Sequence, residues 1–262
     1  MTISRVRSFK MARDGGKYIA YLMESDTAAA QTGGGAPAGG GGQGGQRGAP
    51  PLPANGIPVA TFANVGAGFP NGLPLQPWAD ELVKKRMADN SKDNPDAHCL
   101  PMGFMQFHTH SQPRKIIQTP GLTLIVYEAN NGLRQIFTDG RPLPGKEAEP
   151  WWYGYSVGKW EGDTFVVETT GFIDNIWLDV RGSPMTSEGK VIERFRRPNF
   201  GNLEIEITVD DPKAYTKPWT VRVNWRLVAE EQLIEFICQE NNQFGVAGGL
   251  EEAVDYFFVG VG

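Results

Sequence analysis

Residues 121–141 read GLTLIVYEANNGLRQIFTDGR and carry the strongest local structural signal in the chain. Two apolar runs, 122–127 and 133–137, are rich in the β-branched and aromatic residues that suit a pleated strand. Between them, Asn131-Gly132 predicts a hairpin turn, because both residues accept a positive φ. The stretch therefore predicts a central antiparallel hairpin.

Further segments of the same kind predict the rest of a sheet. Strands are expected at 115–118, 151–160, 164–169, 191–197, 203–209, 219–227 and 232–240, with another in the tail at 251–261. In 203–209 glutamates alternate with aliphatic residues, which places one face in water and the other on a core. About eight strands joined by short turns indicate an all-β fold, an antiparallel up-and-down barrel of lipocalin-like type, since closure removes exposed edges.

One helix is predicted before the barrel. It begins at Pro77, and its early acidic and late basic residues match the helix dipole. We expect four regions along the chain. These are one or more appended, loosely docked strands in 1–30, a disordered Gly/Pro-rich linker at 31–53, an extended segment with the helix and a histidine-containing loop at 54–114, and the barrel at 115–262.

The composition of the chain excludes some classes of partner. With 262 residues and a net charge of −5, the protein does not resemble one that binds nucleic acid or anionic membranes non-specifically. No apolar run approaches the about 18 residues of a membrane-spanning helix, and no signal peptide is recognised in the sequence. Cys99 and Cys238 are the two cysteines, and they either form one disulfide or remain two small buried thiols.

The three histidines lie close together in the sequence. His108 and His110 would share one face of a strand, and His98 or Glu128 could complete a set of three metal ligands with one position open for water. A divalent metal held in this way would activate that water as a nucleophile or base. The alternative is a polar loop in which these histidines hold no metal.

Carboxylates give a second candidate site. Glu128 follows the face of Leu122, Leu124 and Val126, and Glu168 follows Val166 in the same way. If those faces point inward, the acids are buried with a raised pKa and suit acid–base catalysis. Glu128, His110 and Arg134 would then form the catalytic set. The alternative is that Arg134, Arg194 and Arg196 form structural ion pairs with the acids inside the barrel.

Aromatic residues and one long loop give the candidate ligand-binding residues. Trp152, Tyr153, Tyr155 and Trp177 could form flat walls for a small molecule or a sugar ring. In the loop 171–190, Asp179 and Arg181 could bind a polar substrate or each other. The aromatic residues are equally suited to the core of a barrel.

Several longer segments resemble a family of uncharacterised, often exported bacterial proteins. The resemblance rests on CLPMGF (99–104), QTPG (118–121), YEANNGLRQIFTDGRPLP (127–144), WYGYSVGKWEGDTFVVETTGF (152–172) and DDPKAYTKPWT (210–220). The piece GKWEGDTFVVET (158–169) is more loosely similar to lipocalin-like barrels. The resemblance implies a periplasmic or secreted protein and a β-rich fold, but it implies no activity.

Three functions follow from these observations. The first is a small-molecule-binding β-barrel with an aromatic pocket at the barrel mouth. The second is a barrel enzyme, an isomerase, lyase or hydrolase, that uses His108, His110 and Glu128 with or without a metal. The third is a structural or assembly protein whose edge strands pair with other chains, including copies of itself. The first is the preferred interpretation.

Overall fold

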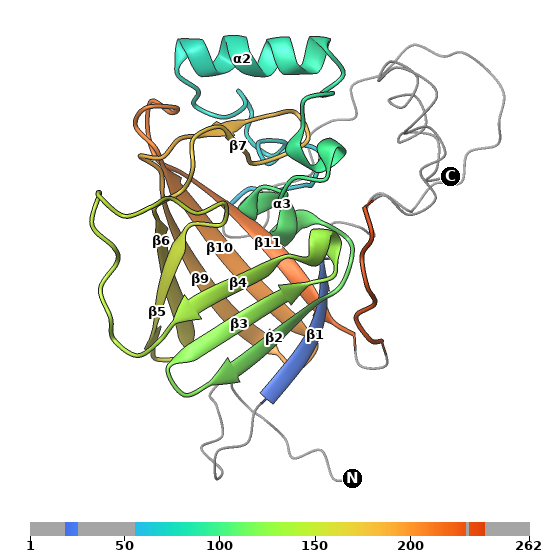
Figure 1. The fold of residues 1–262 in the computed structure, drawn as a ribbon, viewed down its shortest axis with the longest axis vertical. Coiled ribbons are helices and arrows are strands. Elements are labelled where there is room, and N and C mark those ends of the chain that lie inside the picture. The colour runs from blue at the N-terminus through green and yellow to red at the C-terminus, as the bar shows by residue number, and fades with distance from the viewer. Residues whose placement is uncertain (1–18, 26–55, 229–230, 239–262) are drawn as a thin grey trace, which may run out of the picture.

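The computed structural model describes residues 19–25, 56–228 and 231–238, and its strands close into a barrel (Figure 1). Around the barrel the strands follow the order β1-β11-β10-β9-β6-β5-β4-β3-β2. Their bounds are β1 Ile19–Ser25, β2 Arg114–Thr119, β3 Leu122–Tyr127, β4 Leu133–Phe137, β5 Tyr155–Glu161, β6 Thr164–Thr170, β9 Lys190–Asn199, β10 Asn202–Asp210 and β11 Trp219–Leu227. The predicted all-β, barrel-like architecture is confirmed.

The N-terminal strand is part of the barrel. Strand β1 pairs antiparallel with β2, as in Ile19 opposite Gln118, and with β11, as in Met23 opposite Leu227. The expectation of a loosely docked appendage is therefore wrong: β1 covers the two edges that β2 and β11 would otherwise expose. The linker expected at 31–53 and the strand expected at 251–261 lie outside the described residues. The described part of the expected strand 232–240, residues 232–238, is not a strand.

One pair of neighbouring barrel strands departs from a simple up-and-down arrangement. Strands β4 and β5 are parallel, with Ile136 opposite Ser156 and Phe137 opposite Val157, whereas the other barrel neighbours are antiparallel. Parallel strands need a crossover rather than a tight turn. The proline-rich segment 138–154 supplies that connection.

The central hairpin has the predicted strands but a different turn. The two strands lie at the predicted 122–127 and 133–137. Asn130 and Asn131 have the positive φ values, 55° and 49°, whereas Gly132 has a φ of −64°. Asparagine tolerates this left-handed region well. Gly132 is required for a different reason, since a Cβ there would lie 2.6 Å from the ring of Phe107.

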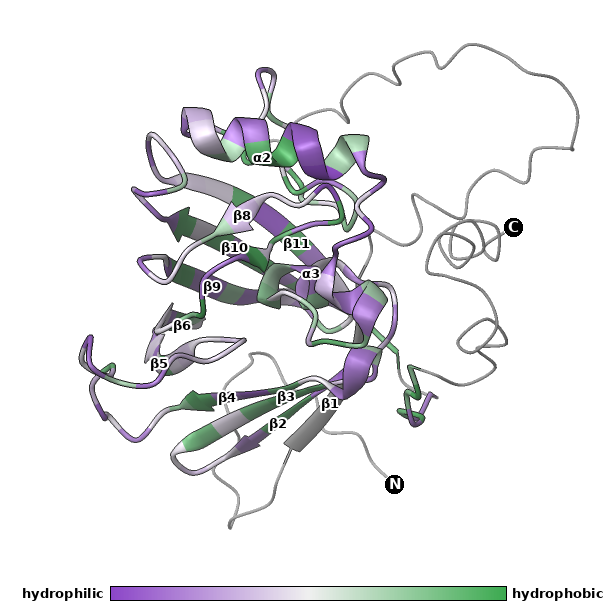
Figure 2. Cartoon of the chain, turned by 45° about the horizontal axis from the view of Figure 1, so that its top comes forward, coloured by the Kyte–Doolittle hydropathy of each residue, from purple (hydrophilic) through white to green (hydrophobic). Residues whose placement is uncertain are grey.

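A short helix fills one end of the barrel. Helix α3 (Phe104–Thr109) has all six residues buried, and Trp225 of β11 donates a hydrogen bond from Nε1 to the carbonyl of His108 at 2.8 Å. The strand or loop expected for this histidine segment is therefore wrong. Figure 2 shows α3 among the barrel strands, whose residues alternate between hydrophobic and hydrophilic. The barrel interior is thus packed with protein side chains.

The inward face of β3 is the opposite of the one on which the buried-acid hypothesis depended. In β3 the buried residues are Thr123, Ile125 and Tyr127, and the face of Leu122, Leu124 and Val126 is only partly covered. A one-residue change of phase exchanges the two faces of a strand. Because both faces of β3 are largely apolar, the alternation alone could not distinguish them.

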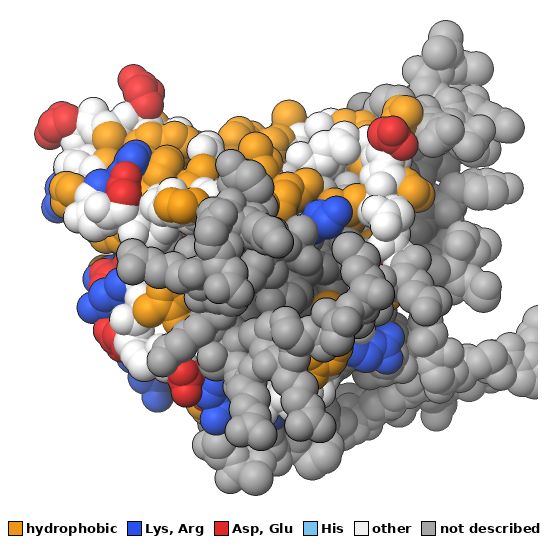
Figure 3. Space-filling view, turned by 90° about the horizontal axis from the view of Figure 1, so that it is seen from below, with side chains coloured by type: hydrophobic (Ala, Val, Ile, Leu, Met, Phe, Trp, Pro, Cys, Tyr) orange, Lys and Arg blue, Asp and Glu red, His pale blue; other side chains and the backbone are white. Residues whose placement is uncertain are grey.

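A second layer covers the end of the barrel where α3 lies. Helix α2 (Pro77–Ala88) begins at the predicted Pro77 and lies across this end beside the small sheet of β7 (Ile176–Trp177) and β8 (Pro184–Met185) (Figure 1). From the opposite end, charged side chains of both signs are interspersed on the visible described surface (Figure 3). Among the described helices, none is long and apolar enough to cross a membrane.

Candidate functional site

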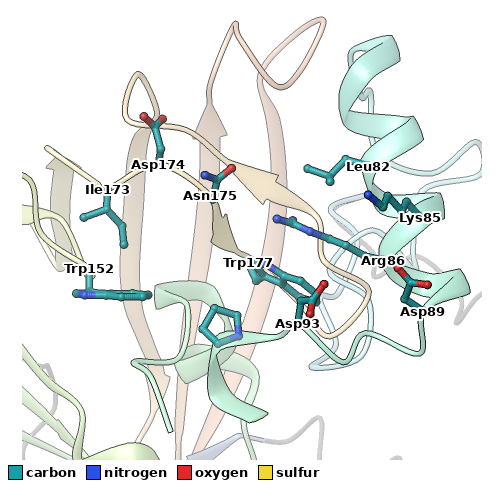
Figure 4. A pocket seen from close by; sticks show the side chains of 11 residues that line it. Leu82, Lys85, Arg86, Asp89, Asp93, Trp152, Ile173, Asp174, Asn175 and Trp177 are labelled. Atoms are coloured by element: carbon teal, nitrogen blue, oxygen red, sulfur yellow. The ribbon is translucent and has the colours of Figure 1, made fainter. Parts of the chain in front are cut away.

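A cleft of about 380 Å³ lies between α2 and the segment that contains β7 (Figure 4). Its lining comes from α2, from the turn that follows this helix, and from two loop segments, one that contains Trp152 and one that spans residues 173–177. The lining residues are Leu82, Lys85, Arg86, Asp89, Asp93, Pro95, Trp152, Ile173, Asp174, Asn175 and Trp177. The cleft therefore combines flat apolar walls with charged groups of both signs, the mixture that small-molecule sites use for affinity and orientation.

Two tryptophans lie on different sides of the cleft. Trp177 in β7 is buried, and the guanidinium of Arg86 lies over its ring, 4.3 Å from the centroid. Trp152 is partly exposed and lies on another side, below Ile173 in the view of Figure 4. A ligand in the cleft can therefore contact the ring of Trp152, whereas Trp177 mainly supports Arg86.

Arg86 is the more buried of the two cationic side chains that line the cleft, since Lys85 is exposed. It comes from the last turn of α2, and its Nη1 donates to the carbonyl oxygen of Gly182 at 2.7 Å. Burial lowers the pKa of Arg86 to about 10, although the negative charge of Asp93 partly opposes this change. Gly182 has a φ of +84°, and a Cβ there would lie 2.4 Å from Cδ of Arg86. The glycine thus makes room for the arginine.

A separate polar network lies inside the barrel. Glu193 of β9 accepts hydrogen bonds from Nε2 of His108 at 2.7 Å and from Nη1 of Arg134 at 2.8 Å, and its other oxygen contacts Nη2 of Arg134. Arg134 also donates to Thr169 at 2.9 Å and to Ser156 at 3.1 Å. These five side chains are buried, so the network joins α3, β4, β5, β6 and β9 away from solvent.

The charges of this network follow from its geometry. Burial opposes ionisation of Glu193, but the guanidinium of Arg134 and hydrogen bonds from Arg134 and His108 outweigh it and lower the pKa of Glu193 to about 2. Burial lowers the pKa of His108, so this imidazole is neutral at pH 7 and donates from Nε2 to the carboxylate. Its Nδ1 has no hydrogen-bond partner among the described residues.

The predicted catalytic set is not brought together. Glu128 is buried, but its Oε2 accepts a hydrogen bond from the backbone of Ile234 at 3.1 Å. His110 packs edge-on against Phe62, and burial, with the charge of Arg114, lowers its pKa to about 4. Arg134 instead joins the internal network. The prediction paired residues by their position in the sequence, whereas the true partner of Arg134 is 59 residues away on β9.

The other acids and arginines of the prediction form pairs on the outside of the barrel. Glu168 pairs with Lys190 at 2.7 Å and is not a buried acid. Arg194 pairs with Glu161 at 3.3 Å, and Arg196 pairs with Glu204 at 2.6 Å. The expectation of ion pairs was therefore correct in kind, but the partners and faces differ.

The structure does not bring the three histidines together as metal ligands. His98 is exposed, in the 3-10 helix Pro95–His98, and its ring contacts the carbonyl of Lys92 at 2.8 Å. His108 lies inside the barrel and His110 at the end of α3. Within the described ranges, no group of three or more His, Cys, Asp or Glu side chains could hold a metal ion. The predicted HxH metal site is wrong because the segment is helical.

The predicted ligand-binding residues divide into two groups. Trp152 and Trp177 line the cleft. The others have neighbours elsewhere. Tyr153 packs on Phe107, and Tyr155 stacks on Phe137. Arg181 donates to Sδ of Met87, whereas Asp179 accepts from the backbone nitrogens of Val65 and Ser183 and from the hydroxyl of Ser183. Asp179 therefore holds the turn 179–183 against the segment that contains Val65. Neither Asp179 nor Arg181 lines the cleft.

Cys99 and Cys238 form a disulfide, one of the two alternatives left open by the sequence. The asparagines of the β3–β4 turn hold both sides of this bridge. Asn130 donates to the carbonyl of Leu100 at 3.1 Å, and Asn131 donates to the carbonyl of Phe236 at 2.7 Å. The segment 231–238 is thus held by a covalent bond to Cys99, next to the 3-10 helix Pro95–His98, and by a hydrogen bond from the β3–β4 turn to its backbone.

Arg86 and its neighbours in α2 were not among the residues predicted from the sequence to form a site. The cluster Lys84-Lys85-Arg86 resembles the solvated basic end of a helix. Only the long-range contact with Gly182 distinguishes Arg86 from the two lysines.

Comparisons with protein-family models, with curated proteins and with solved structures found no match.

Proposed function

We propose that the protein binds a small molecule in the cleft between α2 and Trp152. The observation that carries this proposal is the cleft itself, about 380 Å³ with an indole wall and a few charged groups. This volume lies near the lower end of the range for small-molecule sites, about 300–1,000 Å³. The site therefore suits a compact ligand of one or two rings.

The cleft is a better candidate than the barrel interior. Helix α3 occupies the mouth in which a lipocalin-like protein would hold its ligand, and its six residues are buried. A ligand inside the barrel would have to displace the aromatic and methionine side chains of this helix. The preferred function from the sequence is thus retained, with the ligand placed outside the barrel.

A screen for ligand-induced stabilisation tests the proposal. A bound ligand raises the melting temperature because it binds only the folded state. Compounds that stabilise the wild-type protein are tested again with Trp152→Ala and with the matched control Trp151→Ala, which removes an adjacent indole that does not line the cleft. We expect the stabilisation to disappear only in Trp152→Ala. If Trp152→Ala retains it for every compound, the ligand site lies elsewhere.

A second candidate function, acid–base catalysis, is supported by His108. Its hydrogen bond to Glu193 would orient the ring, and the unpartnered Nδ1 could act as a base. The side chains of both residues have 0% exposure, so a substrate would need α3 to move. Acylation of histidines followed by mass spectrometry tests this alternative. Rapid modification of His108 in the native protein would favour it, and protection until global unfolding would exclude it.

A further inference from the structure

We propose that the ligand of this cleft is a ring-bearing monocarboxylate whose carboxylate is held by the guanidinium of Arg86. This inference rests on the proposed function, since it names the chemical class that the same cleft would select. It is carried by the position of Arg86, by the groups that surround it and by the apolar wall of the cleft.

The guanidinium of Arg86 has free binding capacity directed into the cleft. Of its five N–H donors, one is used for the carbonyl of Gly182. None of the ion pairs between described residues includes Arg86. Figure 4 shows its side chain extending from α2 above Trp177 toward the middle of the cleft. An incoming carboxylate can therefore reach donors that no carboxylate of the described chain occupies.

The surroundings of Arg86 favour an anion over a neutral ligand. The side chain is half-buried between α2 and Trp177, and this burial lowers its pKa to about 10, which means that the charged form has lost part of its hydration. The negative charges of Asp93 and Asp179 raise the pKa again but offset only part of this loss. A carboxylate would restore the lost interactions through the two parallel hydrogen bonds that the planar guanidinium can donate. Lysine could not reproduce this geometry.

The rest of the cleft indicates the remaining chemistry of the ligand. Its apolar lining includes the indole of Trp152 and the side chains of Ile173 and Pro95, which suit an aromatic or alicyclic ring. Around the same cleft, Lys85 adds one positive charge, but the three carboxylates of Asp89, Asp93 and Asp174 outnumber it and leave the lining beyond Arg86 net negative. They would repel a second anionic group on the ligand. The cleft should therefore accept one carboxylate and disfavour dicarboxylates and phosphates.

The position of Arg86 depends on Gly182. Because of the positive φ of this glycine, and because an added Cβ would approach Cδ of Arg86 so closely, Gly182→Ala would displace the arginine without removing its charge. Gly182 is thus a positioning residue. The glycine variant separates the geometric part of the anion preference from a general effect of positive charge.

Pairs of compounds with the same skeleton test the proposal by calorimetry. We would measure phenylacetate against phenylethanol, and cyclohexanecarboxylate against cyclohexylmethanol, with the wild-type protein. Hydrogen bonds to charged groups predict that each acid binds about 10- to 100-fold more tightly than its alcohol. In Arg86→Gln the preference should fall to about two-fold or less. In the matched control Arg181→Gln, which removes the same charge from a residue outside the cleft, it should remain.

Further variants keep the test valid if Arg86→Gln fails to fold. Arg86→Lys retains the charge, and Gly182→Ala retains the guanidinium, so each should lose about ten-fold of the preference for the acid. Equal binding of acid and alcohol by the wild-type protein, or a preference that survives in all three variants, would overturn the proposal. If neither series binds but other compounds show stabilisation that depends on Trp152, the carboxylate inference fails and the binding function stands. If no compound does so, both fail.

Discussion

Replacement of Glu193 by glutamine gives the sharpest test of the internal network. The change preserves the shape of the side chain but removes its charge, which leaves the buried guanidinium of Arg134 without a counter-ion. Loss of one partner from a buried ion pair costs about 3–5 kcal/mol, because the remaining charge stays desolvated. Ser156 and Thr169 would still accept hydrogen bonds from Arg134, so we expect a value near the lower end, about 3 kcal/mol.

The matched control is Glu204→Gln on the neighbouring strand β10. Glu204 pairs with Arg196 at 2.6 Å and, more distantly, with Arg222 at 3.9 Å. Its close partner Arg196 lies on the outer face, with its side chain 62% exposed. Exposed pairs contribute about 0–1 kcal/mol. Urea unfolding followed by tryptophan fluorescence at pH 7 gives both free energies of unfolding. A cost for Glu193→Gln that equals the control would refute the stabilising role of the network.

The pH dependence of the same variant provides an independent check. The pKa of Glu193 is lowered from 4.5 to about 2 in the folded protein. An acid whose pKa is lowered by folding stabilises the protein above its unfolded pKa, and this stabilisation is lost as the pH falls toward the folded pKa. The difference in stability between wild type and Glu193→Gln should therefore be constant above pH 4.5 and shrink below it. A difference that grows on acidification would contradict the assignment.

Four further predictions concern other parts of the molecule. Cys99→Ser/Cys238→Ser opens a link between residues 139 apart in the sequence and should lower the free energy of unfolding in urea by about 2–5 kcal/mol; an unchanged value would mean that the bridge does not constrain the unfolded chain. Gly103→Ala would place a Cβ 1.8 Å from the carbonyl oxygen of Trp177 and should cost about 1–3 kcal/mol by the same assay, whereas Gly145→Ala, which meets no atom, should cost far less. His110 has an ordinary pKa of 6.5 and a folded pKa of about 4, so the stability that its neutral form contributes is complete above pH 6.5 and is lost as the pH falls toward 4. His110→Gln should therefore flatten the dependence of the melting temperature on pH between 6.5 and 4. An unchanged slope would contradict the lowered pKa of His110. Because the three histidines lie apart, zinc added after a chelator should not change the melting temperature of the wild type or of His108→Ala/His110→Ala. A zinc-dependent rise of the melting temperature in the wild type alone would restore the metal hypothesis.

The sequence predicted those elements whose signal is local. The strands at 122–127, 133–137 and 219–227 and the helix start at Pro77 agree with the structure, because apolar runs, turn residues and a helix-starting proline lie within a few residues of one another. The helix Phe104–Thr109 was missed, since six residues are too few to establish a helical period. Its conformation depends on being buried inside the barrel.

The candidate sites depended on contacts that the sequence does not reveal. His108 reaches Glu193 across 85 residues, and Arg86 reaches Gly182 across 96. Only the barrel closure and the packing of α2 on the loop layer bring these partners together. Trp152 and Trp177 were identified because they belong to a conspicuous set of aromatic residues. That they line one cleft together with the basic end of α2 could be seen only in the three-dimensional arrangement.

The most direct test of the binding cleft is a titration followed by the indole N–H signals of the seven tryptophans in a ¹H–¹⁵N spectrum. Single Trp→Phe variants assign the signals, and phenylacetate is the added compound. We predict that the signals of Trp152 and Trp177 move in a saturable manner and that those of Trp219 and Trp225, buried in the barrel, do not. Movement of Trp219 or Trp225 instead would place the ligand inside the barrel. An unchanged spectrum would contradict carboxylate binding in the cleft.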